Sequence, residues 1–384
     1  LWENDVRPVW KATLAECNAT AGTFTVGLSA VGGNVFSVHP YGSTNPNTDG
    51  KVYEYSARDV GLITEIDCRV SYLRTKKQVR NDGSAIFGRD SFLSGCVFQD
   101  GVKHNTFGEP GTRFIDCIAW KCDWTTRDDW TGFVFFALDP SGKTSYASNC
   151  IVKVGQAQRD FAIAASRGVT AFYSHTTGIL ENNWTEIGYY NCSAAMCRTA
   201  FSASDTNSLR LEVCLAEDSP NPFVLGGRNN VATDLHAPRP SGIGMIRMVE
   251  ILGDANTNLD GIRFYGIFTA DGDIYAPTDN GTLNLSNSVI YRAAHASPHF
   301  LFRSSGTKVV NLAGNIFNMD TSLGTSIILS NVNGQWSDNV IQGSDEGDFI
   351  IAGVEYPTYD DFVTAEPILA NGTVFTAIEQ LVDP

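Results

Sequence analysis

The chain has few basic residues, little charge of either sign and no long apolar run. Its 384 residues include 27 Lys and Arg against 42 Asp and Glu, which gives a formal net charge of −15. A nucleic-acid binder needs a basic face to neutralise phosphates, so we expect no nucleic-acid partner. Charged residues make up only 18% of the chain and hydrophobic residues 43%, a composition that excludes general disorder.

Apolar runs are too short to cross a membrane. The longest dense run, Phe133 to Leu138, has the length of one strand, whereas a spanning helix needs about 20 apolar residues. We therefore expect no membrane insertion. The chain begins at Leu1 without a charged and then apolar leader, so we interpret it as a mature form or an excised fragment.

Residues typical of strands and turns are plentiful. The chain holds 36 Gly, 22 Phe and 13 Tyr, which favours an all-β fold. Its nine cysteines are an odd number, and the last of them is Cys214. A chain of this size needs no disulfide staples, and the cysteine spacing does not match a zinc site. We expect most of these cysteines to be buried free thiols.

A short phrase recurs along the chain: usually a polar residue or Gly, then a marker, then two mostly apolar residues. The markers are Cys96, Cys117, Cys150, Cys192, Cys214, Ser288, Asn315 and Asn339, and we take Cys68 as the first of the series. The short intervals between successive markers define a period in the twenties, while the longer intervals from Cys117 to Cys150 and from Cys150 to Cys192 carry insertions. Such a period in strand-like text predicts a solenoid whose coils bury their apolar faces on one another.

With this coil pattern the sequence resembles the single-stranded right-handed parallel β-helix. That pectin-lyase-like architecture is shared by polysaccharide lyases, several glycoside hydrolases and bacteriophage tailspikes. The regular Leu spacing of leucine-rich repeats and the four-stranded blades of a β-propeller are absent. The catalytic signatures of pectate lyases and polygalacturonases are also absent, so the resemblance is one of coil pattern only.

The flanks of the repeat differ from it in composition. We assign residues 1–55 to an N-terminal cap or connector, 56–350 to the parallel β-helix and 351–384 to a C-terminal cap with a short helix around Tyr359 to Ala365. The proline-containing stretch Glu217 to Gly244 is a long break that is able to separate two halves of the solenoid.

Chemistry is expected in the insertions, because β-helices bind ligands in grooves walled by long turns. The richest segment holds Trp124, Arg127, Asp128, Asp129 and Trp130. Trp rings stack on sugars, and neighbouring carboxyls can divide into an acid and a base. The alternative is that the carboxylates are solvated turn residues and the two Trp cover a core edge.

Alignment on the markers brings three charged pairs to the same turn of consecutive coils. These pairs are Lys103 and His104, Arg127 and Asp128, and Arg159 and Asp160. Cleavage of an acidic sugar by a lyase needs a cation and a base, which the basic residues supply, and hydrolysis needs two carboxyls, which Asp128, Asp129 and Asp160 supply. The alternative is a row of salt bridges between coils.

Two further sets are weaker candidates. The long interval between Cys150 and Cys192 predicts the far end of the same groove, with substrate-binding residues Tyr173, His175, Glu181, Trp184 and Glu186. Oxygen side chains at alternate positions resemble a calcium loop, although Leu259 stands where Gly is expected and an Asx-rich turn is the alternative. The candidate Ca²⁺ ligands are Asp254, Asn256, Asn258 and Asp260.

The resemblance and the candidate residues together imply a function. We expect a tailspike-like depolymerase that recognises and cleaves a bacterial surface polysaccharide, located on a virion tail or outside the cell. Tailspikes of this kind are homotrimers, and unpaired thiols suit folding in a reducing compartment. A non-catalytic structural or adhesion protein of a virion and a secreted polysaccharide lyase are the alternatives.

Overall fold

The computed structural model covers residues 1–384. It describes all of them except 1, 4–8, 29–33, 46–47, 51–52, 55–61, 77–84, 102–103, 122–129, 138–142, 157–159, 161–168, 177–183, 205, 207, 239–246, 253–254, 267–273, 277–280, 293–298, 305–308, 320–326, 330–333, 344–348, 352–353, 366–371, 373 and 378–384. Side chains of a few strand residues are likewise outside the description.

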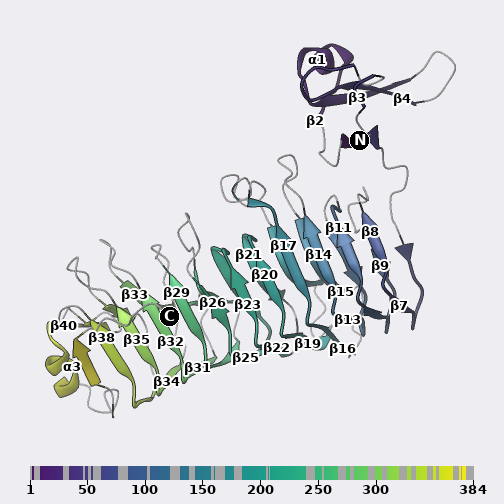
Figure 1. The fold of residues 1–384 in the computed structure, drawn as a ribbon. Coiled ribbons are helices and arrows are strands. Elements are labelled where there is room, and N and C mark those ends of the chain that lie inside the picture. The colour runs from purple at the N-terminus through teal and green to yellow at the C-terminus, as the bar shows by residue number, and fades with distance from the viewer. Residues whose placement is uncertain are drawn as a thin grey trace.

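The described strands form three long sheets whose members follow one another in a fixed order around each coil. Sheet I runs from β7 to β37, sheet II from β8 to β41 and sheet III from β6 to β40, and each strand pairs in parallel with the strand one coil away. The one antiparallel pair in these sheets, among the described residues, joins β39 and β40 at the end of the stack. Parallel strands with crossovers of one hand make this chain a right-handed parallel β-helix, as predicted. Figure 1 shows the coils stacked along one axis, with the helix α3 (Tyr359–Ala365) at the far end.

Short strands alternate with tight corners in all three sheets. Sheet I contains β7 (Arg69–Ser71), β10 (Phe92–Ser94), β13 (Arg113–Ile115), β16 (Lys143–Ser148), β19 (Trp184–Tyr190), β22 (Ser208–Glu212), β25 (Asn229–Thr233), β28 (Asn256–Asp260), β31 (Thr282–Ser286), β34 (Val309–Ala313) and β37 (Trp336–Ser337). Sheet II contains β8 (Arg74–Lys76), β11 (Val97–Gln99), β14 (Ile118–Lys121), β17 (Ile151–Val154), β20 (Ser193–Ala195), β23 (Leu215–Glu217), β26 (His236–Ala237), β29 (Arg263–Gly266), β32 (Val289–Arg292), β35 (Ile316–Met319), β38 (Val340–Gly343) and β41 (Val374–Ala377). Sheet III contains β6 (Leu62–Ile63), β9 (Ala85–Phe87), β12 (His104–Gly108), β15 (Trp130–Ala137), β18 (Val169–Thr176), β21 (Thr199–Ser204), β24 (Asn221–Gly226), β27 (Val249–Ile251), β30 (Ile274–Ala276), β33 (His299–Ser304), β36 (Ile327–Leu329), β39 (Phe349–Ile351) and β40 (Val354–Tyr356).

The markers form an inward ladder at corner I/II, the bend between sheets I and II. All eight clear markers are at most 1% exposed. From Cys96 to Asn315, the backbone carbonyl of each marker accepts a hydrogen bond from the next coil. The donor is the backbone N–H of the residue that directly follows the ladder position of that coil. For example, Ile151, which follows Cys150, donates its N–H to Cys117 O at 3.0 Å. The predicted ladder of small side chains is therefore confirmed.

The first member of the ladder is Leu73 and not Cys68. Val97 N donates to Leu73 O at 2.8 Å, whereas the carbonyl of Cys68 accepts from Phe92 N at the start of sheet I. Cys68 thus lies at a different corner, and its use as a marker is wrong. Leu235 and Ile262 continue the ladder through the stretch where no polar marker occurs, because their carbonyls accept from Arg263 N and Val289 N.

The eight cysteines that the structure describes are free thiols, as expected. Seven of them are buried, and the neighbouring Cys150 thiol together with burial raises the pKa of Cys117 to about 12. A thiol with a raised pKa is a poor nucleophile. These cysteines therefore act as small core residues.

The residue before each marker has left-handed backbone geometry, which explains why the phrase favours Asn, Asp or Gly there. Asn149, Asn191 and Asn287 have φ values of 53°, 49° and 49°. Asn tolerates this region because its short polar side chain is able to bond nearby backbone groups. Here it also joins neighbouring coils, since Asn191 Nδ2 donates to Asn149 Oδ1 at 2.8 Å. Val213 has a φ of 53° although it is β-branched, and it is 55% exposed.

Replacing Val213 by Asn is expected to stabilise the protein by about 1 kcal/mol, because it removes a β-branched residue from the left-handed region. The free energy of unfolding, measured by denaturant titration, tests this expectation. Val309→Asn is the matched control, since Val309 is 38% exposed and lies in a strand. An equal gain in both variants would mean that backbone geometry at Val213 is not the cause.

Phenylalanines fill the interior of the central coils. One Phe from each of four consecutive strands of sheet III stacks face to face on the next, with ring centroids 5.4 Å apart for Phe133 and Phe172, 4.9 Å for Phe172 and Phe201, and 5.5 Å for Phe201 and Phe223. All four rings are at most 1% exposed. Stacked aromatic pairs contribute beyond their buried area, so this column is a main source of stability.

The proline-containing stretch does not interrupt the solenoid over the part that is described. Strands β24, β25 and β26 run through it and pair in register with β21, β22 and β23. The predicted break is therefore wrong for residues 221–237, while 239–246 lie outside the described residues. Local proline content misled the prediction, because proline is tolerated near the start of a strand and Pro222 is the second residue of β24.

The two ends of the solenoid are covered differently. At the C-terminal end α3 (Tyr359–Ala365) is present where a helix was predicted, and its Phe362 packs on Trp336 and Tyr356 with ring centroids 5.7 Å apart in each pair. After this helix β41 pairs with β38, so the coil continues within the segment that we assigned to the cap. The cap covers an end of the core that otherwise would face water.

The N-terminal segment forms its own small structure. It contains β1 (Trp2–Glu3), which pairs with β5 (Tyr53–Glu54), and a sheet of β2 (Val9–Trp10), β3 (Thr23–Leu28) and β4 (Asn34–His39). Helix α1 (Leu14–Ala19) starts with a capping box between Thr13 and Glu16. Figure 1 draws this unit beside the first coils. Among the described residues, no helix is both long and apolar enough to span a membrane.

Candidate functional site

Long connections leave the solenoid at the two corners that flank sheet III. At corner II/III, between sheets II and III, β14 ends at Lys121 and β15 begins at Trp130, and the next coil connects Val154 to Val169. At corner III/I, between sheets III and I, the same coils carry residues 138–142 and 177–183. Strands β15 and β18 lie between these connections and have eight residues each. The two eight-residue strands of sheet III are thus joined to the rest of their coils by such connections at both ends.

A row of polar side chains follows corner II/III from coil to coil. Its members are His104, Thr131, Thr170, Thr199 and Asn221, which are Cα partners in register. Thr170 stands between the fully buried Val169 and Ala171, so alternation along the strand directs it outward. Except for Thr131, which is 6% exposed, the members of this polar row are half-buried. Hydroxyl and amide groups at one repeat of about 4.8 Å can bond a ligand that runs along the helix axis.

A second row lies beside it on sheet III. Phe107, Val134, Tyr173 and Ser202 are partners in register, and Tyr173 is half-buried between two residues with no exposure, Phe172 and Ser174. Tyr173 therefore points outward, on the outer face of sheet III. Its ring offers an apolar surface next to the hydroxyls of the polar row.

A fully buried lysine lies beneath corner II/III. Lys121 is 0% exposed, its Nζ donates to Gly101 O at 2.9 Å, and it lies 5.5 Å from the ring centroid of Trp130. A charged ammonium loses its hydration on burial and needs partners to compensate. Buried ionisable groups cluster at functional sites more often than on structural surfaces. Lys121 directly precedes the 122–129 connection, which is the richest segment predicted from the sequence.

Polar groups one coil away surround the acceptor of Lys121. Asp100 is 1% exposed, adopts a φ of 54° and accepts from Gln99 Nε2 at 3.0 Å. Gln99 Oε1 in turn accepts from Arg74 at 2.6 Å. Asn105 Oδ1 accepts from Gly101 N at 2.7 Å, which fixes the turn that presents the Gly101 carbonyl. The floor of this corner is therefore a bonded polar network and not an apolar core.

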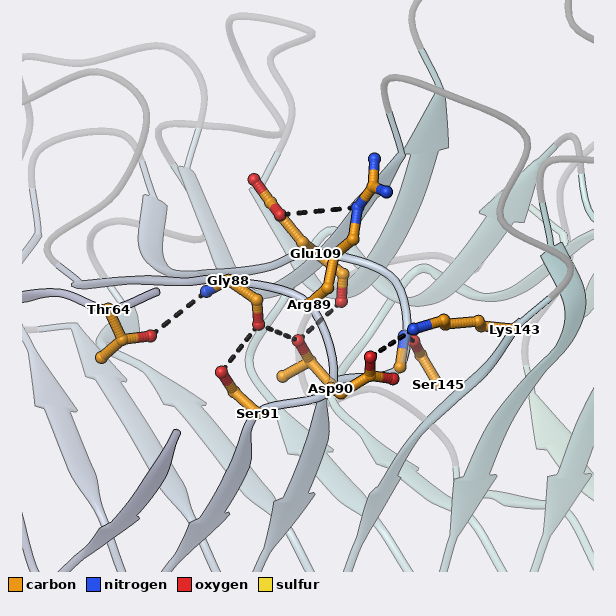
Figure 2. A network of polar contacts seen from close by, with 10 residues as sticks. Thr64, Gly88, Arg89, Asp90, Ser91, Glu109, Lys143 and Ser145 are labelled. Carbon is orange, nitrogen blue, oxygen red and sulfur yellow. Dashed lines mark hydrogen bonds and ion pairs between the residues drawn. The ribbon is translucent and has the colours of Figure 1, made fainter. Parts of the chain in front are cut away.

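Corner III/I carries a network of another kind, which Figure 2 shows from close by. Gly88 N donates to Thr64 Oγ1 at 3.2 Å, Ser91 Oγ donates to Gly88 O at 2.7 Å, and Gly111 N donates to Ser145 Oγ at 2.8 Å. Lys143 pairs with Asp90, and Arg89 Nε lies 4.0 Å from Glu109 Oε2. These contacts join the turns of successive coils and balance their charges. We interpret this corner as structural.

Several predicted site residues lie outside the described residues. These are Lys103, Trp124, Arg127, Asp128, Asp129, Arg159, Glu181 and Asp254, and for His175 and Trp184 only the backbone, on β18 and β19, is described. The strands that precede and follow residues 102–103, 122–129 and 157–159 pair in register. Among the predicted residues near these positions that the structure describes, Asp160 is exposed and His104 is half-buried.

Trp130 is placed differently from the sequence interpretation. Its ring is 1% exposed and belongs to the core, beneath Lys121, so it offers no open face to a sugar. The alternative interpretation of this residue, that it covers a core edge, fits the structure. Trp130 supports the corner from inside.

The second predicted cluster is divided between two sheets. Tyr173 is on sheet III, whereas Glu186 is on sheet I, where it accepts from the Tyr190 hydroxyl at 3.3 Å. Burial and the nearby Glu186 carboxylate raise the pKa of Tyr190 to about 12. The sequence placed these residues together because they share one interval. The corner between β18 and β19 separates them.

The calcium-loop interpretation does not fit the described residues. Asn256, Asn258 and Asp260 lie on the extended strand β28, where alternate residues are about 7 Å apart and cannot surround one ion. Their oxygens bind neighbouring coils: Asn258 Oδ1 accepts from Asn284 at 2.6 Å, and Asp260 Oδ1 accepts from Ser286 at 2.7 Å. Within the described part of the chain, no three His, Cys, Asp or Glu residues are grouped as a metal site.

Sequence reasoning missed Lys121, Trp120 and the Thr residues of the polar row. Lys121 had a signal, because it is a charged residue at an inward position of a strand with the pattern Ile118, Ala119, Trp120, Lys121. The Thr row had none, because its members Thr131, Thr170 and Thr199 are far apart in the sequence and unevenly spaced. Only the coil register aligns them.

The fold defines this chain as a right-handed parallel β-helix protein. In comparisons with protein families, with curated proteins and with solved structures, none matches the chain.

Proposed function

We propose that this chain binds an extended polysaccharide along the outer face of sheet III and cleaves it at corner II/III. The observation that carries the proposal is the polar row on sheet III, which is in register over five coils: His104, Thr131, Thr170, Thr199 and Asn221. A repeating polymer presents hydroxyls at regular intervals, and a straight row of donors and acceptors matches it. Tyr173 adds an apolar surface for the face of a sugar ring.

Cleavage is assigned to residues of the connections between sheets II and III. For hydrolysis, Asp128, Asp129 and Asp160 supply an acid and a base; for elimination, Arg127, Arg159 and Lys103 neutralise a sugar carboxylate and His104 takes the proton. Trp124 is the remaining predicted stacking residue of this corner. The buried Lys121 supports the assignment, because it directly precedes residues 122–129 in the chain and is 0% exposed.

The proposal extends to location and assembly. We infer a tailspike-like homotrimer on a virion tail or outside the cell, with residues 1–55 as the connecting part. The free, buried thiols support folding in a reducing compartment before display. A non-catalytic adhesion protein of a virion and a secreted polysaccharide lyase remain the alternatives, and mass measurement under native conditions distinguishes trimer from monomer.

The double variant Thr170→Val and Thr199→Val is expected to weaken polysaccharide binding about tenfold, since each lost hydrogen bond contributes about 1 kcal/mol or less. Binding to capsular and O-antigen polysaccharides is measured by affinity electrophoresis. Thr144→Val is the control, because Thr144 is exposed on sheet I. Equal weakening in the control, or none in the double variant, would reject the polar row as the binding surface.

Cleavage is followed separately, as new reducing ends and as absorbance of new unsaturated ends. Asp128→Ala, Asp129→Ala and Asp160→Ala are expected to abolish it while binding is retained. Cleavage that survives all three would move the catalytic site elsewhere. Binding without any cleavage of the polysaccharide that binds best would leave the adhesion function.

A further inference from the structure

The outer face of sheet II has a charge opposite to that of the whole chain. Its described outward strand positions carry the cations Arg74, Lys76, Lys153 and Arg263 and one carboxylate, Glu217. The chain as a whole has 42 acidic and 27 basic residues. A cationic face on an acidic protein concentrates anionic ligands and leaves the rest of the surface repulsive to them.

Trp120 is the centre of this face. It is 45% exposed and stands between the fully buried Ala119 and Lys121, so its ring points away from the core. Its partners in register on the adjacent coils are Gln99 and Lys153. Lys76 is the partner of Gln99 and lies one coil further on.

Apolar side chains and a fixed guanidinium complete the platform. Ile118 and Ile151, which are 38% and 46% exposed, are partners in the neighbouring row, and Arg74 stands two coils from Ile118 in that row. Arg74 Nη2 donates to Gln99 Oε1 on the next coil at 2.6 Å, and this hydrogen bond fixes the position of the Arg74 guanidinium. Successive coils lie about 4.8 Å apart. The strand position of Lys153 is therefore about 5 Å from that of Trp120 on one side, and the strand position of Lys76 is about 10 Å away on the other.

We propose that this face binds an anionic polysaccharide, with one sugar ring stacked on Trp120 and its carboxylates paired with Lys153 and Lys76. An exposed indole beside the apolar row of Ile118 and Ile151 suits the CH face of a sugar, and the flanking ammonium groups suit the charges of neighbouring residues along the polymer. This inference rests on the proposed function and names its substrate class. Trp120 directly precedes Lys121 and corner II/III, so the platform adjoins the proposed cleavage site.

Nucleic acid is the less favoured polyanion for the same face. A duplex or single strand is bound through many phosphate contacts along a basic groove, whereas this face spreads four cations over eight coils of an acidic protein. A second copy of the chain is a further candidate occupant of an exposed apolar surface. Both become outcomes of the test.

The test measures binding of the full chain to alginate, hyaluronate and polysialate, to their carboxyl-reduced forms and to neutral dextran. At least one acidic polymer is expected to bind, and its carboxyl-reduced form to bind about tenfold more weakly or worse. Trp120→Ala is expected to weaken this binding at least about tenfold and Lys153→Gln about threefold to tenfold. Trp10→Ala and Lys11→Gln, in the N-terminal unit, are the controls, because Trp10 is 57% exposed.

Four outcomes overturn the inference. They are no binding of any acidic polymer at low salt, equal binding of the carboxyl-reduced form, tighter binding of oligo-dT than of every polysaccharide, and dissociation of an oligomer as the sole effect of Trp120→Ala. The Thr170→Val and Thr199→Val variant separates the two proposals. If it loses polysaccharide binding while Trp120→Ala does not, sheet III remains the binding face and the sheet II platform is rejected.

Discussion

Truncation of Phe201 to alanine is expected to lower the free energy of unfolding by about 3–5 kcal/mol, the usual cost of removing a buried phenyl ring. Phe201 is 1% exposed and stacks on Phe172 at 4.9 Å and on Phe223 at 5.5 Å. Its loss leaves a cavity in the middle of the column and breaks both stacking contacts. The coils above and below cannot close the gap, because their spacing is fixed by hydrogen bonds between strands.

Denaturant titration followed by circular dichroism measures this loss. Ile63→Ala is the control, because Ile63 is 61% exposed in β6 and its truncation is expected to cost less than about 0.5 kcal/mol. A loss of similar size in both variants would show that the Phe column does not dominate the core. Binding of polysaccharide at low temperature, where both variants stay folded, is expected to be unchanged, since Phe201 points inward.

Replacement of Asn315 by alanine is expected to cost about 2–5 kcal/mol, because it leaves several buried polar groups without a partner. Asn315 is 0% exposed, its Oδ1 accepts from Ser288 N at 3.0 Å, and its Nδ2 donates to Leu285 O at 2.9 Å and to Asn339 Oδ1 at 2.9 Å. Three consecutive coils therefore depend on one side chain. A cysteine ladder avoids this dependence, since thiols are weak donors that pack as small apolar groups.

Hydrogen exchange locates this effect as well as measuring it. In a solenoid each coil contacts only its neighbours, so Asn315→Ala is expected to deprotect β31 to β38 and to leave β10 to β17 unchanged. Asn284→Ala is the matched control, because Asn284 belongs to an outer ladder in which Asn258 and Asn311 bond to it and all three reach solvent. Uniform deprotection of the whole chain would contradict the local role of Asn315.

The two proposed binding surfaces share one edge of the molecule. The polar row of sheet III and the Trp120 platform of sheet II meet at corner II/III, where Lys121, Asp100 and Asn105 form the bonded floor. A polymer that wraps this corner would contact both surfaces. Corner III/I, in contrast, carries the network that we interpret as structural.

The coil pattern was predictable because it depends on residues that are adjacent in the sequence. A marker such as Cys150 needs a small side chain that fits inside a tight bend, and the residue before it needs left-handed geometry, which Asn149 tolerates. These two local requirements recur from coil to coil. The phrase could not be recognised where apolar residues such as Leu235 and Ile262 occupy the inward position. At Cys68 the sequence pattern was misassigned, because this residue lies at a different corner.

The site was only partly predictable because side-chain direction is not a local property. The sequence indicated the segment from Cys122 to Trp130 as rich in chemistry, and the structure places its borders at corner II/III. It gave no means to separate the buried Trp130 from the exposed Trp120 on the preceding strand. Nor did it divide Tyr173 from Glu186, which lie on different sheets.

The sequence by itself determined that the chain is an all-β solenoid with free inward thiols and turns of varied length, since each of these follows from composition and from residues next to one another. The tertiary structure alone decided which outward residues are neighbours. The register between coils is set by hydrogen bonds between their strands, and it does not depend on the length of the connection that joins two strands. Trp120 and Lys153 therefore lie side by side although a whole coil separates them along the chain, because the insertions between them leave the solenoid at its corners.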